Sequence, residues 1–202
     1  MTQAMIETKQ LTKCYHAKPV VDHLDLSVPE GAIYGFLGPN GAGKSTTMKM
    51  LLGLISRDRG TIVIGGKEMN VMNRISILKQ VGSLIENPSY YSNLTAHENL
   101  QISCMLRGLP FCEIDRVLSI VRLDGQKKKK TAHYSLGMKQ RLGLAGALLG
   151  SPKLIFLDEP TNGLDPSGIH EMRELIKSLP RQFGMTVMVS SHLLSEIEQT
   201  AD

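Results

Sequence analysis

The sequence predicts an α/β protein. A mostly parallel sheet forms its core, an antiparallel β region precedes the core, and a helical region is inserted into it. Three observations support this fold class. Short apolar runs alternate with helical patterns, which is typical of parallel strands with helices on both faces of the sheet. A glycine-rich loop connects one apolar run to a helix, and another apolar run ends in two adjacent carboxylates.

The opening third of the chain favours short strands and tight turns. Strands are predicted over 6–9 and 20–28, with an imperfect alternation of apolar and polar residues in the second. A further strand over 61–64 runs into Gly65 and Gly66, a pair typical of a hairpin turn. This part therefore forms the antiparallel region.

A loop with the pattern G-x-x-x-x-G-K-[ST] follows the apolar run 32–37. Its glycines let backbone N–H groups close around phosphate oxygens without side chains intervening. A helix is predicted over 45–55, because apolar residues recur at i, i+3, i+4 and i+7 from Met48. The N-terminus of that helix presents N–H groups and a partial positive charge to an anion. The sequence thus predicts a nucleoside triphosphate site formed by Gly38, Pro39, Asn40, Gly41, Ala42, Gly43, Lys44, Ser45 and Thr46.

The middle of the chain changes to helical patterns. Thr95 and Glu98 form a capping box that opens a helix, and this helix should end near Gly108. A second helix is predicted from residue 111 or 112 to about 123. These helices belong to a helical subdomain that spans about 87–149 and is inserted into the α/β core.

The α/β pattern resumes after the helical region. An apolar strand is predicted over 153–157 and another over 186–190. Helices are predicted over 167–179 and 193–199. No internal repeat interrupts this order. The chain therefore forms a single domain with one inserted subdomain.

Length and composition fit one globular domain. The 202 residues can bury a sizeable core, and no run approaches the roughly 20 apolar residues of a membrane span. The N-terminus lacks the layout of a signal peptide. Cys14, Cys104 and Cys112 show neither an even count nor metal spacing, which fits a reducing cytosol. The net charge of +4 is scattered except at Lys127–Lys130, which we interpret as an exposed loop or, alternatively, a surface for lipid headgroups or a partner.

The residues at the ends of the loop and of the second apolar run suit phosphoryl chemistry. Lys44 can bridge the β- and γ-phosphates, and Ser45 offers its hydroxyl to Mg²⁺. The apolar run 154–157 delivers Asp158 and Glu159 to the carboxyl edge of the sheet. We expect Asp158 to hold Mg²⁺ through water and Glu159 to polarise an attacking water.

These segments, with the sequence Asn-Gly-Leu-Asp-Pro at 162–166, resemble the nucleotide-binding subunit of an ABC transporter. Walker A lies at 38–46 and Walker B at 154–159, in the order and spacing of that family. The resemblance covers nearly all of residues 1–202 and implies a P-loop NTPase fold of the ABC ATPase type, with ATP and Mg²⁺ as ligands. It also implies further strands and helices after Asp202, so we expect the chain to be truncated at its C-terminus.

Further residues take roles from this resemblance. Asp165 matches the D-loop aspartate that crosses to the other subunit, and His192 matches the switch histidine that contacts the γ-phosphate. Tyr15 lies where the family places an aromatic ring under the adenine. One such stack contributes about 1–3 kcal/mol and tolerates any base. We therefore expect weak discrimination of ATP from GTP.

The segment 134–138 lies where the family has Leu-Ser-Gly-Gly-Gln. Ser135 and Gly137 match this signature, whereas Tyr134, Leu136 and Met138 depart from it. A serine hydroxyl and helix-start N–H groups remain, and they can bind the γ-phosphate held by an opposite subunit. The resemblance therefore implies a homodimer, or a dimer with a related subunit.

Glu86 stands where the family has the Q-loop glutamine. A carboxylate can still accept a hydrogen bond from metal-bound water, but it cannot donate one. With the signature segment, Glu86 makes the chain resemble the ATP-binding subunits of bacitracin- and lantibiotic-immunity exporters. Glu86 is thus a candidate for the metal site with Ser45 and Asp158.

The resemblance implies an ATPase that docks on a transmembrane permease subunit and powers export. It would then lie in the cytoplasm at the inner face of the membrane, and would touch the membrane through its partner only, with no nucleic acid bound. One alternative is a soluble ABC ATPase acting on ribosomes or DNA, although such proteins usually carry two nucleotide domains or long coiled-coil insertions. The other is a nucleotide-dependent regulator without turnover, which an intact Glu159 argues against.

Overall fold

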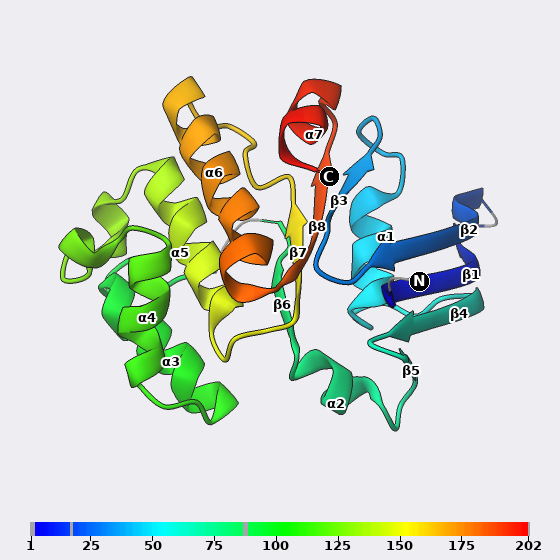
Figure 1. Ribbon diagram of the computed structural model, residues 1–202, viewed down its shortest axis with the longest axis horizontal. Helices are drawn as coiled ribbons and strands as arrows, with labels where there is room; N and C mark the ends of the chain where they lie inside the picture. Colours follow the sequence, from blue (N-terminus) through cyan, green and yellow to red (C-terminus); the bar gives the residue numbers. More distant parts are fainter. Residues whose placement is uncertain (1–2, 17, 87–88, 202) are drawn as a thin grey trace.

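The computed structural model describes residues 3–16, 18–86 and 89–201. It contains two four-stranded sheets, and several helices pack against them (Figure 1). The strands are β1 Ala4–Tyr15, β2 Lys18–Pro29, β3 Ile33–Leu37, β4 Arg59–Ile64, β5 Lys67–Glu68, β6 Val81–Leu84, β7 Leu154–Asp158 and β8 Thr186–Ser191. The helices are α1 Lys44–Leu51, α2 Arg74–Leu78, α3 Ala96–Arg107, α4 Cys112–Ile120, α5 Leu136–Leu148, α6 Pro166–Phe183 and α7 Leu194–Thr200, with short 3-10 helices at Asp124–Gln126 and Thr131–His133.

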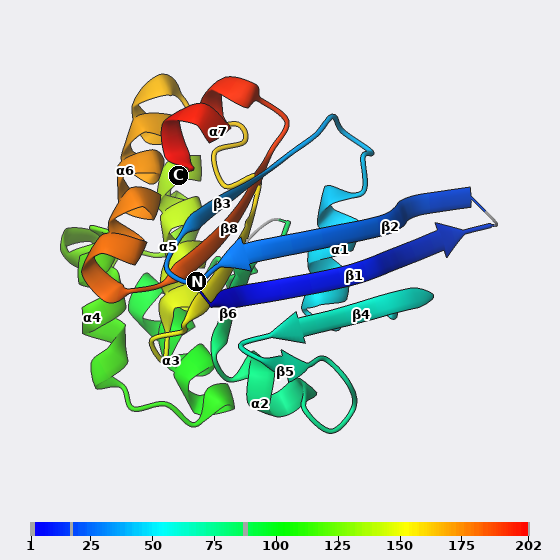
Figure 2. The ribbon, with the colours of Figure 1, turned by 45° about the vertical axis from the view of Figure 1, so that its right-hand side comes forward.

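The first sheet has the order β2-β1-β4-β5, and its pairs are antiparallel (Figure 2). The predicted antiparallel region is therefore confirmed, and the turn at Gly65 and Gly66 joins β4 to β5. The strands are longer than predicted. In β1 the register shifts between Thr8 and Leu11, and Gln10 takes a positive φ of 51°. These irregularities break the alternation of buried and exposed residues, so the sequence pattern revealed only part of the strand.

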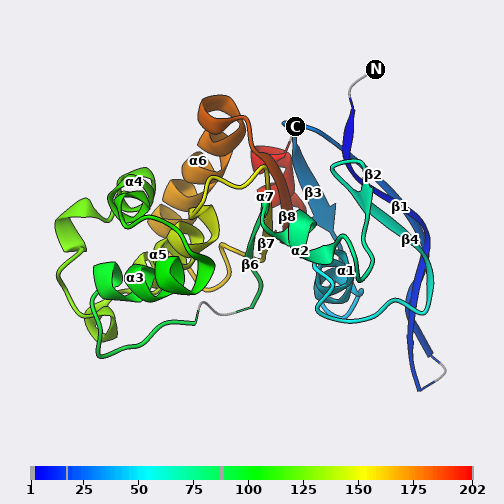
Figure 3. The same ribbon diagram turned by 90° about the horizontal axis from the view of Figure 1, so that it is seen from below.

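The second sheet is parallel and has the order β3-β8-β7-β6. Every residue of β7 and β8 is buried. Ile155 and Leu157 belong to the core cluster that includes residues of α3 to α6, whereas Leu154 and Phe156 belong to the cluster with α1 and the antiparallel sheet. The parallel sheet is thus covered on both faces, as predicted, and α1 lies between the two sheets (Figure 3).

Strand β6 and helix α2 were not predicted from the sequence. β6 has only four residues, and two of them are Gly82 and Ser83. A Cβ at Gly82 would lie 2.1 Å from the carbonyl oxygen of Ala147, so only glycine permits this approach of β6 to α5. α2 has five residues, and only Ile77 is buried. Neither element is long enough to show a periodic pattern.

The helices after β6 pack together and against the parallel sheet. The capping box is confirmed: Thr95 Oγ1 accepts a hydrogen bond from the Glu98 amide at 3.2 Å, and Glu98 Oε2 accepts one from the Thr95 amide at 2.7 Å. Gly108 caps the end of α3, also as predicted. The start of the expected helical subdomain at residue 87 lies outside the described residues. Its treatment as a separate subdomain over 87–149 stays a proposal.

Several helix ends differ from their predicted positions. α1 ends at Leu51 instead of Ile55, because the chain turns at Gly53, where φ is 62°. α4 ends at Ile120, three residues before the predicted end. α6 continues through Pro180, which follows the predicted end, and stops before Gly184. Within the described part of the chain, no helix is both long and apolar enough to cross a membrane.

Candidate functional site

The glycine-rich loop connects β3 to α1 and surrounds the ammonium group of Lys44. Gly43 takes a φ of 85°, and a Cβ there would lie 2.5 Å from the carbonyl oxygen of Val20. Lys44 is 6% exposed, and its Nζ donates to the carbonyl oxygens of Gly38 at 2.7 Å and Pro39 at 3.2 Å. The loop thus surrounds a nearly buried cation.

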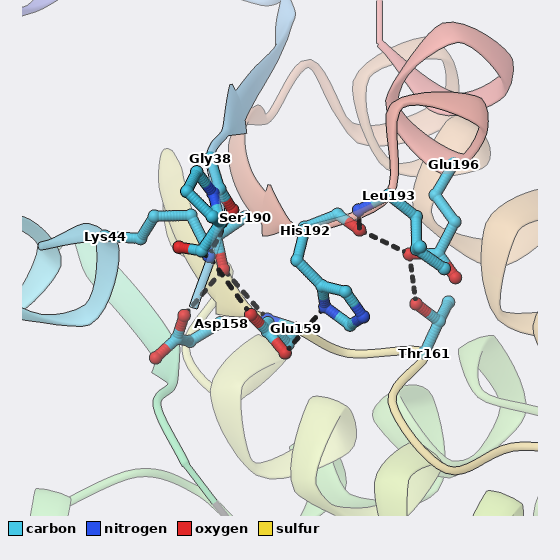
Figure 4. Close-up of polar contacts among 11 residues, drawn as sticks. Gly38, Lys44, Asp158, Glu159, Thr161, Ser190, His192, Leu193 and Glu196 are labelled. Atoms are coloured by element: carbon cyan, nitrogen blue, oxygen red, sulfur yellow. Dashed lines mark hydrogen bonds and ion pairs between the residues drawn. The ribbon is translucent and has the colours of Figure 1, made fainter. Parts of the chain in front are cut away.

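Three side chains that are far apart in the sequence meet at the carboxyl edge of the parallel sheet (Figure 4). Lys44 Nζ lies 3.3 Å from Glu159 Oε1, and His192 Nδ1 lies 3.2 Å from Glu159 Oε2. Glu159 has a φ of 48°, a conformation that is uncommon for a residue with a side chain. Such strain is typical of functional sites, where the surrounding structure holds the residue in place. Glu159 therefore links the phosphate loop to His192.

Ser190 forms hydrogen bonds with both Walker B residues, Asp158 and Glu159. Its hydroxyl donates to Asp158 Oδ1 at 2.6 Å and accepts from the Glu159 amide at 3.0 Å. Asp158 and Ser190 are paired across β7 and β8, and both are buried. Ser190 was not predicted as a site residue, although the strand 186–190 was predicted to end there. Only the register between the two strands shows this role.

One cavity of about 410 Å³ lies beside these residues. Gln140 lines it and is 6% exposed, and its Oε1 has no hydrogen-bond partner among the described residues. A buried acceptor without a partner is costly, which suits a cavity that receives a polar ligand. The residues that line the cavity are Ser45, Glu86, Leu136, Gln140, Asp158, Glu159, Asn162 and Gly163.

The oxygen atoms of this cavity fit a Mg²⁺ ion that is bound together with phosphates. Mg²⁺ prefers oxygen ligands and is usually held by one or two carboxylates and by substrate phosphates. Ser45, Asp158 and Glu86, the three residues predicted as metal ligands, all line the cavity. These oxygen donors are therefore of the kind that Mg²⁺ prefers, and their role as its ligands stays a prediction.

Glu86 forms an ion pair with a lysine on the helix that follows the phosphate loop. Lys49 Nζ contacts Glu86 Oε1 at 2.5 Å, and Glu86 takes a φ of 63°. The hydrogen bond to Glu86 raises the pKa of Lys49, and the charges of Glu86 and Asp158 raise it further. Lys49 lies one turn after Ser45 on the same helix, so the spacing of these two residues indicates that Lys49 lies near the site. Lys49 was nevertheless missed as a neighbour of the site.

Other residues of the predicted site lie outside this cavity. Ser135 caps α5, where its hydroxyl accepts from the Met138 amide at 3.3 Å. Asp165 caps α6 and accepts from the Gly168 amide at 3.3 Å. Tyr15, at the end of β1, is 45% exposed, and Lys13 Nζ lies 5.4 Å from the centre of its ring. These side chains and Gly137 are not among the residues that line the cavity.

The departures from the signature segment have structural roles. Tyr134 is buried, and its hydroxyl donates to the carbonyl oxygen of Gln126 at 2.7 Å. Leu136 is 46% exposed and lines the cavity. A Cβ at Gly163 would lie 3.1 Å from Leu136 Cδ2. The signature segment thus packs against the loop that carries Asp165 within the same chain.

Comparisons with known proteins identify the family of this chain. A family model described as ABC transporter matches residues 21–162. The bacitracin transport ATP-binding protein BcrA of Bacillus licheniformis is 53% identical over 98% of this chain, and the lantibiotic transport ATP-binding protein SrtF of Streptococcus pyogenes is 44% identical over 98%. The chain spans 65% of the length of that BcrA and 84% of SrtF.

Among solved structures, cbiO1 from Clostridium perfringens, part of the ABC transporter complex cbiONQ, superposes with a TM-score of 0.89. The match covers 98% of this chain and 82% of cbiO1, at 25% identity. The predicted ABC ATPase fold is therefore confirmed, as is the resemblance to bacitracin and lantibiotic relatives. The chain belongs to the ABC transporter family of ATP-binding proteins.

Proposed function

We propose that this chain binds ATP with Mg²⁺, hydrolyses it, and thereby powers export of a lantibiotic or another peptide antibiotic through a separate membrane subunit. One observation supports the hydrolysis above all others. Glu159 contacts both Lys44 and His192 at the edge of a cavity that Ser45 and Asp158 also line. This arrangement brings a phosphate-binding cation, a base and a proton-carrying side chain together.

The residues of the site have distinct tasks in this proposal. The ammonium of Lys44, which lies inside the glycine-rich loop, would bind the β- and γ-phosphates, and the loop N–H groups would bind the remaining phosphate oxygens. Glu159 orients and polarises the attacking water. His192, which lies 3.2 Å from Glu159, would contact the γ-phosphate. Mg²⁺, held by Ser45, Asp158 and Glu86, would neutralise charge on the phosphates.

We propose that the complete site forms between two subunits. Ser135 and Gly137 do not line the cavity of their own chain, and Asp165 is exposed. The start of α5 presents the hydroxyl and the backbone N–H groups that suit a phosphate held elsewhere. A homodimer, or a dimer with a related subunit, would bring Ser135 to the γ-phosphate of the opposite ATP. Asp165 would cross the same interface.

A large groove suits the membrane subunit. It has a volume of about 720 Å³ and lies between β6 and helices α3 and α5. Leu54, Tyr91 and Leu106 line it and are 58%, 61% and 84% exposed. Apolar side chains at this level of exposure in one concave surface mark an interaction site. We assign the groove to a cytoplasmic segment of the permease, and its lining residue Ile85 adjoins Glu86 at the nucleotide site.

The soluble alternative predicts a different partner. Co-purification from native membranes should recover a transmembrane subunit with this protein, and should not recover ribosomes or nucleic acid. Cells should also become more sensitive to peptide antibiotics when Lys44 or Glu159 is substituted. Recovery of ribosomes, with no change in sensitivity, would favour the alternative.

Glu86→Gln is expected to leave ATP binding intact and to change its coupling to transport. The substitution removes a negative charge beside the phosphates and restores an amide that can donate a hydrogen bond. It also removes the ion pair with Lys49, an exposed pair of the kind that contributes at most about 1 kcal/mol. ATP affinity measured by titration should therefore match that of the unsubstituted protein, while the ratio of ATP hydrolysed to substrate exported should change. Loss of nucleotide binding would contradict this role for Glu86.

Turnover of ATP and GTP is expected to differ by less than about a hundredfold, because a stack of about 1–3 kcal/mol on Tyr15 does not distinguish bases. The contacts of the triphosphate and Mg²⁺ should dominate affinity for both nucleotides. Rates of phosphate release with each nucleotide at saturation test this expectation. A larger difference would require base-specific hydrogen bonds.

A further inference from the structure

Glu196 lies on α7 and connects the two segments that carry Glu159 and His192 (Figure 4). A single oxygen, Oε2, accepts hydrogen bonds from Ser191 Oγ at 2.6 Å and from Thr161 Oγ1 at 2.9 Å. Thr161 follows Glu159 by two residues, and Ser191 directly precedes His192. One carboxylate therefore holds the chain on both sides of the contact between Glu159 and His192.

Ser191 also links Glu196 to Leu193, the residue that follows His192. Its hydroxyl donates to Glu196 and accepts from the amide of Leu193 at 3.0 Å. Ser191 is thus bonded to Glu196 directly, and Leu193 is linked to Glu196 through the Ser191 hydroxyl. Ser191 itself is 3% exposed. Because hydrogen bonds to a carboxylate are stronger than those between neutral groups, this arrangement restricts the backbone at His192.

The segment of Glu159 needs such a restraint. Glu159 takes a strained φ of 48°, and Pro160 separates it from Thr161. A residue in this conformation persists only where its surroundings hold it. The Thr161 hydroxyl supplies one of these anchors through Glu196.

Glu196 is half-buried and accepts hydrogen bonds from two hydroxyls of its own chain. The space beside it, which Arg173 and Ile176 also line, has a volume of about 10 Å³. This is no more than a single water needs. The carboxylate is part of neither the cavity of about 410 Å³ nor the phosphate loop.

We propose that Glu196 is a positioning residue for ATP hydrolysis: it sets the contact between His192 and Glu159 by holding Ser191 and Thr161. This inference rests on the roles proposed above for Glu159 and His192. The inference adds Glu196, which has no task in the function proposed above.

Glu196→Ala is expected to lower kcat by about 10- to 100-fold, because small displacements of reacting groups have effects of this size. KM for ATP should stay close to that of the unsubstituted protein, since Glu196 touches no part of the cavity. Glu196→Gln keeps an oxygen that accepts both hydroxyls, and should retain most of the turnover. Thr161→Val removes one of the two anchors and should lower kcat less than Glu196→Ala.

The test uses phosphate release by the complete natural protein, with its membrane subunit where turnover depends on it. Glu198→Ala is the matched control, because Glu198 is an exposed glutamate on the same helix and its side chain has no hydrogen bond or ion pair within the described residues. This variant should keep normal turnover. Thermal unfolding of each variant, followed by circular dichroism, identifies any loss that comes from unfolding.

A double substitution separates positioning from a merely structural role. In a His192→Ala background, Glu196→Ala should cause a smaller further loss, because the part of its effect that acts through His192 is already absent and only the anchor to Thr161 remains to be lost. The same fold-loss in both backgrounds would overturn the proposal, as would normal turnover in Glu196→Ala or no rescue by Glu196→Gln. If His192→Ala itself keeps normal turnover, the proposed role of His192 fails instead.

Discussion

Glu159→Gln is expected to lower ATP turnover by about 10²- to 10⁴-fold, the range that a positioned general base contributes. Glutamine keeps the shape of the side chain and an acceptor for His192, but it cannot take a proton from water. ATP binding should remain, because Lys44 and the loop N–H groups are unchanged. The variant should therefore accumulate as an ATP-bound dimer, which size-exclusion chromatography with and without ATP can detect.

Glu174→Gln is a suitable control for this experiment. Glu174 is an exposed glutamate on α6 and is absent from the lining of the cavity. The Glu174→Gln variant should hydrolyse ATP at the normal rate and form no stable dimer. Normal turnover in Glu159→Gln would exclude Glu159 as the base. Absence of turnover in the unsubstituted complex would instead favour a regulator that binds nucleotide without hydrolysing it.

Lys44→Met is expected to weaken ATP binding by about a hundredfold, because two charge-assisted hydrogen bonds to phosphate are lost, at about 1.5 kcal/mol or more each. Methionine fills a similar volume in this buried position, where Lys44 is 6% exposed. It also leaves Glu159 without the cation at 3.3 Å. Isothermal titration with ATP and Mg²⁺ measures the loss, and turnover should fall with it.

Lys79→Met controls for the removal of a positive charge from the surface. Lys79 is exposed at the end of α2 and is not among the residues that line the cavity. ATP affinity should not change in this variant. An unchanged affinity in Lys44→Met would mean that the loop N–H groups alone hold the phosphates.

Local sequence predicted the parts of the site that depend on a few neighbouring residues. The phosphate loop requires glycine at 43, since φ is 85° and any Cβ would meet the carbonyl of Val20. The capping box of Thr95 and Glu98 spans four residues and forms as predicted. The conformation of each motif depends on residues within a short segment. Each could therefore be predicted before the fold was known.

Elements without such a local signal were missed. β6 needs glycine at position 82 because α5 packs closely against it. The contacting residue, Ala147, lies 65 residues further along the chain. The sequence of β6 is therefore too short and too small in its side chains to predict a strand. Helix α6 was predicted to end before Pro180, yet packing carries the helix through that residue.

The sequence by itself determined the fold class and the family, and it predicted the side chains that would hold phosphate, polarise water and bind a metal. Only the tertiary structure decided which of them meet. Ser190 reaches Asp158 because β7 and β8 are in parallel register, and Glu196 reaches Thr161 because α7 packs back over the sheet. The physical reason is that motif chemistry is local, whereas these contacts depend on burial and strand pairing across 30 or more residues.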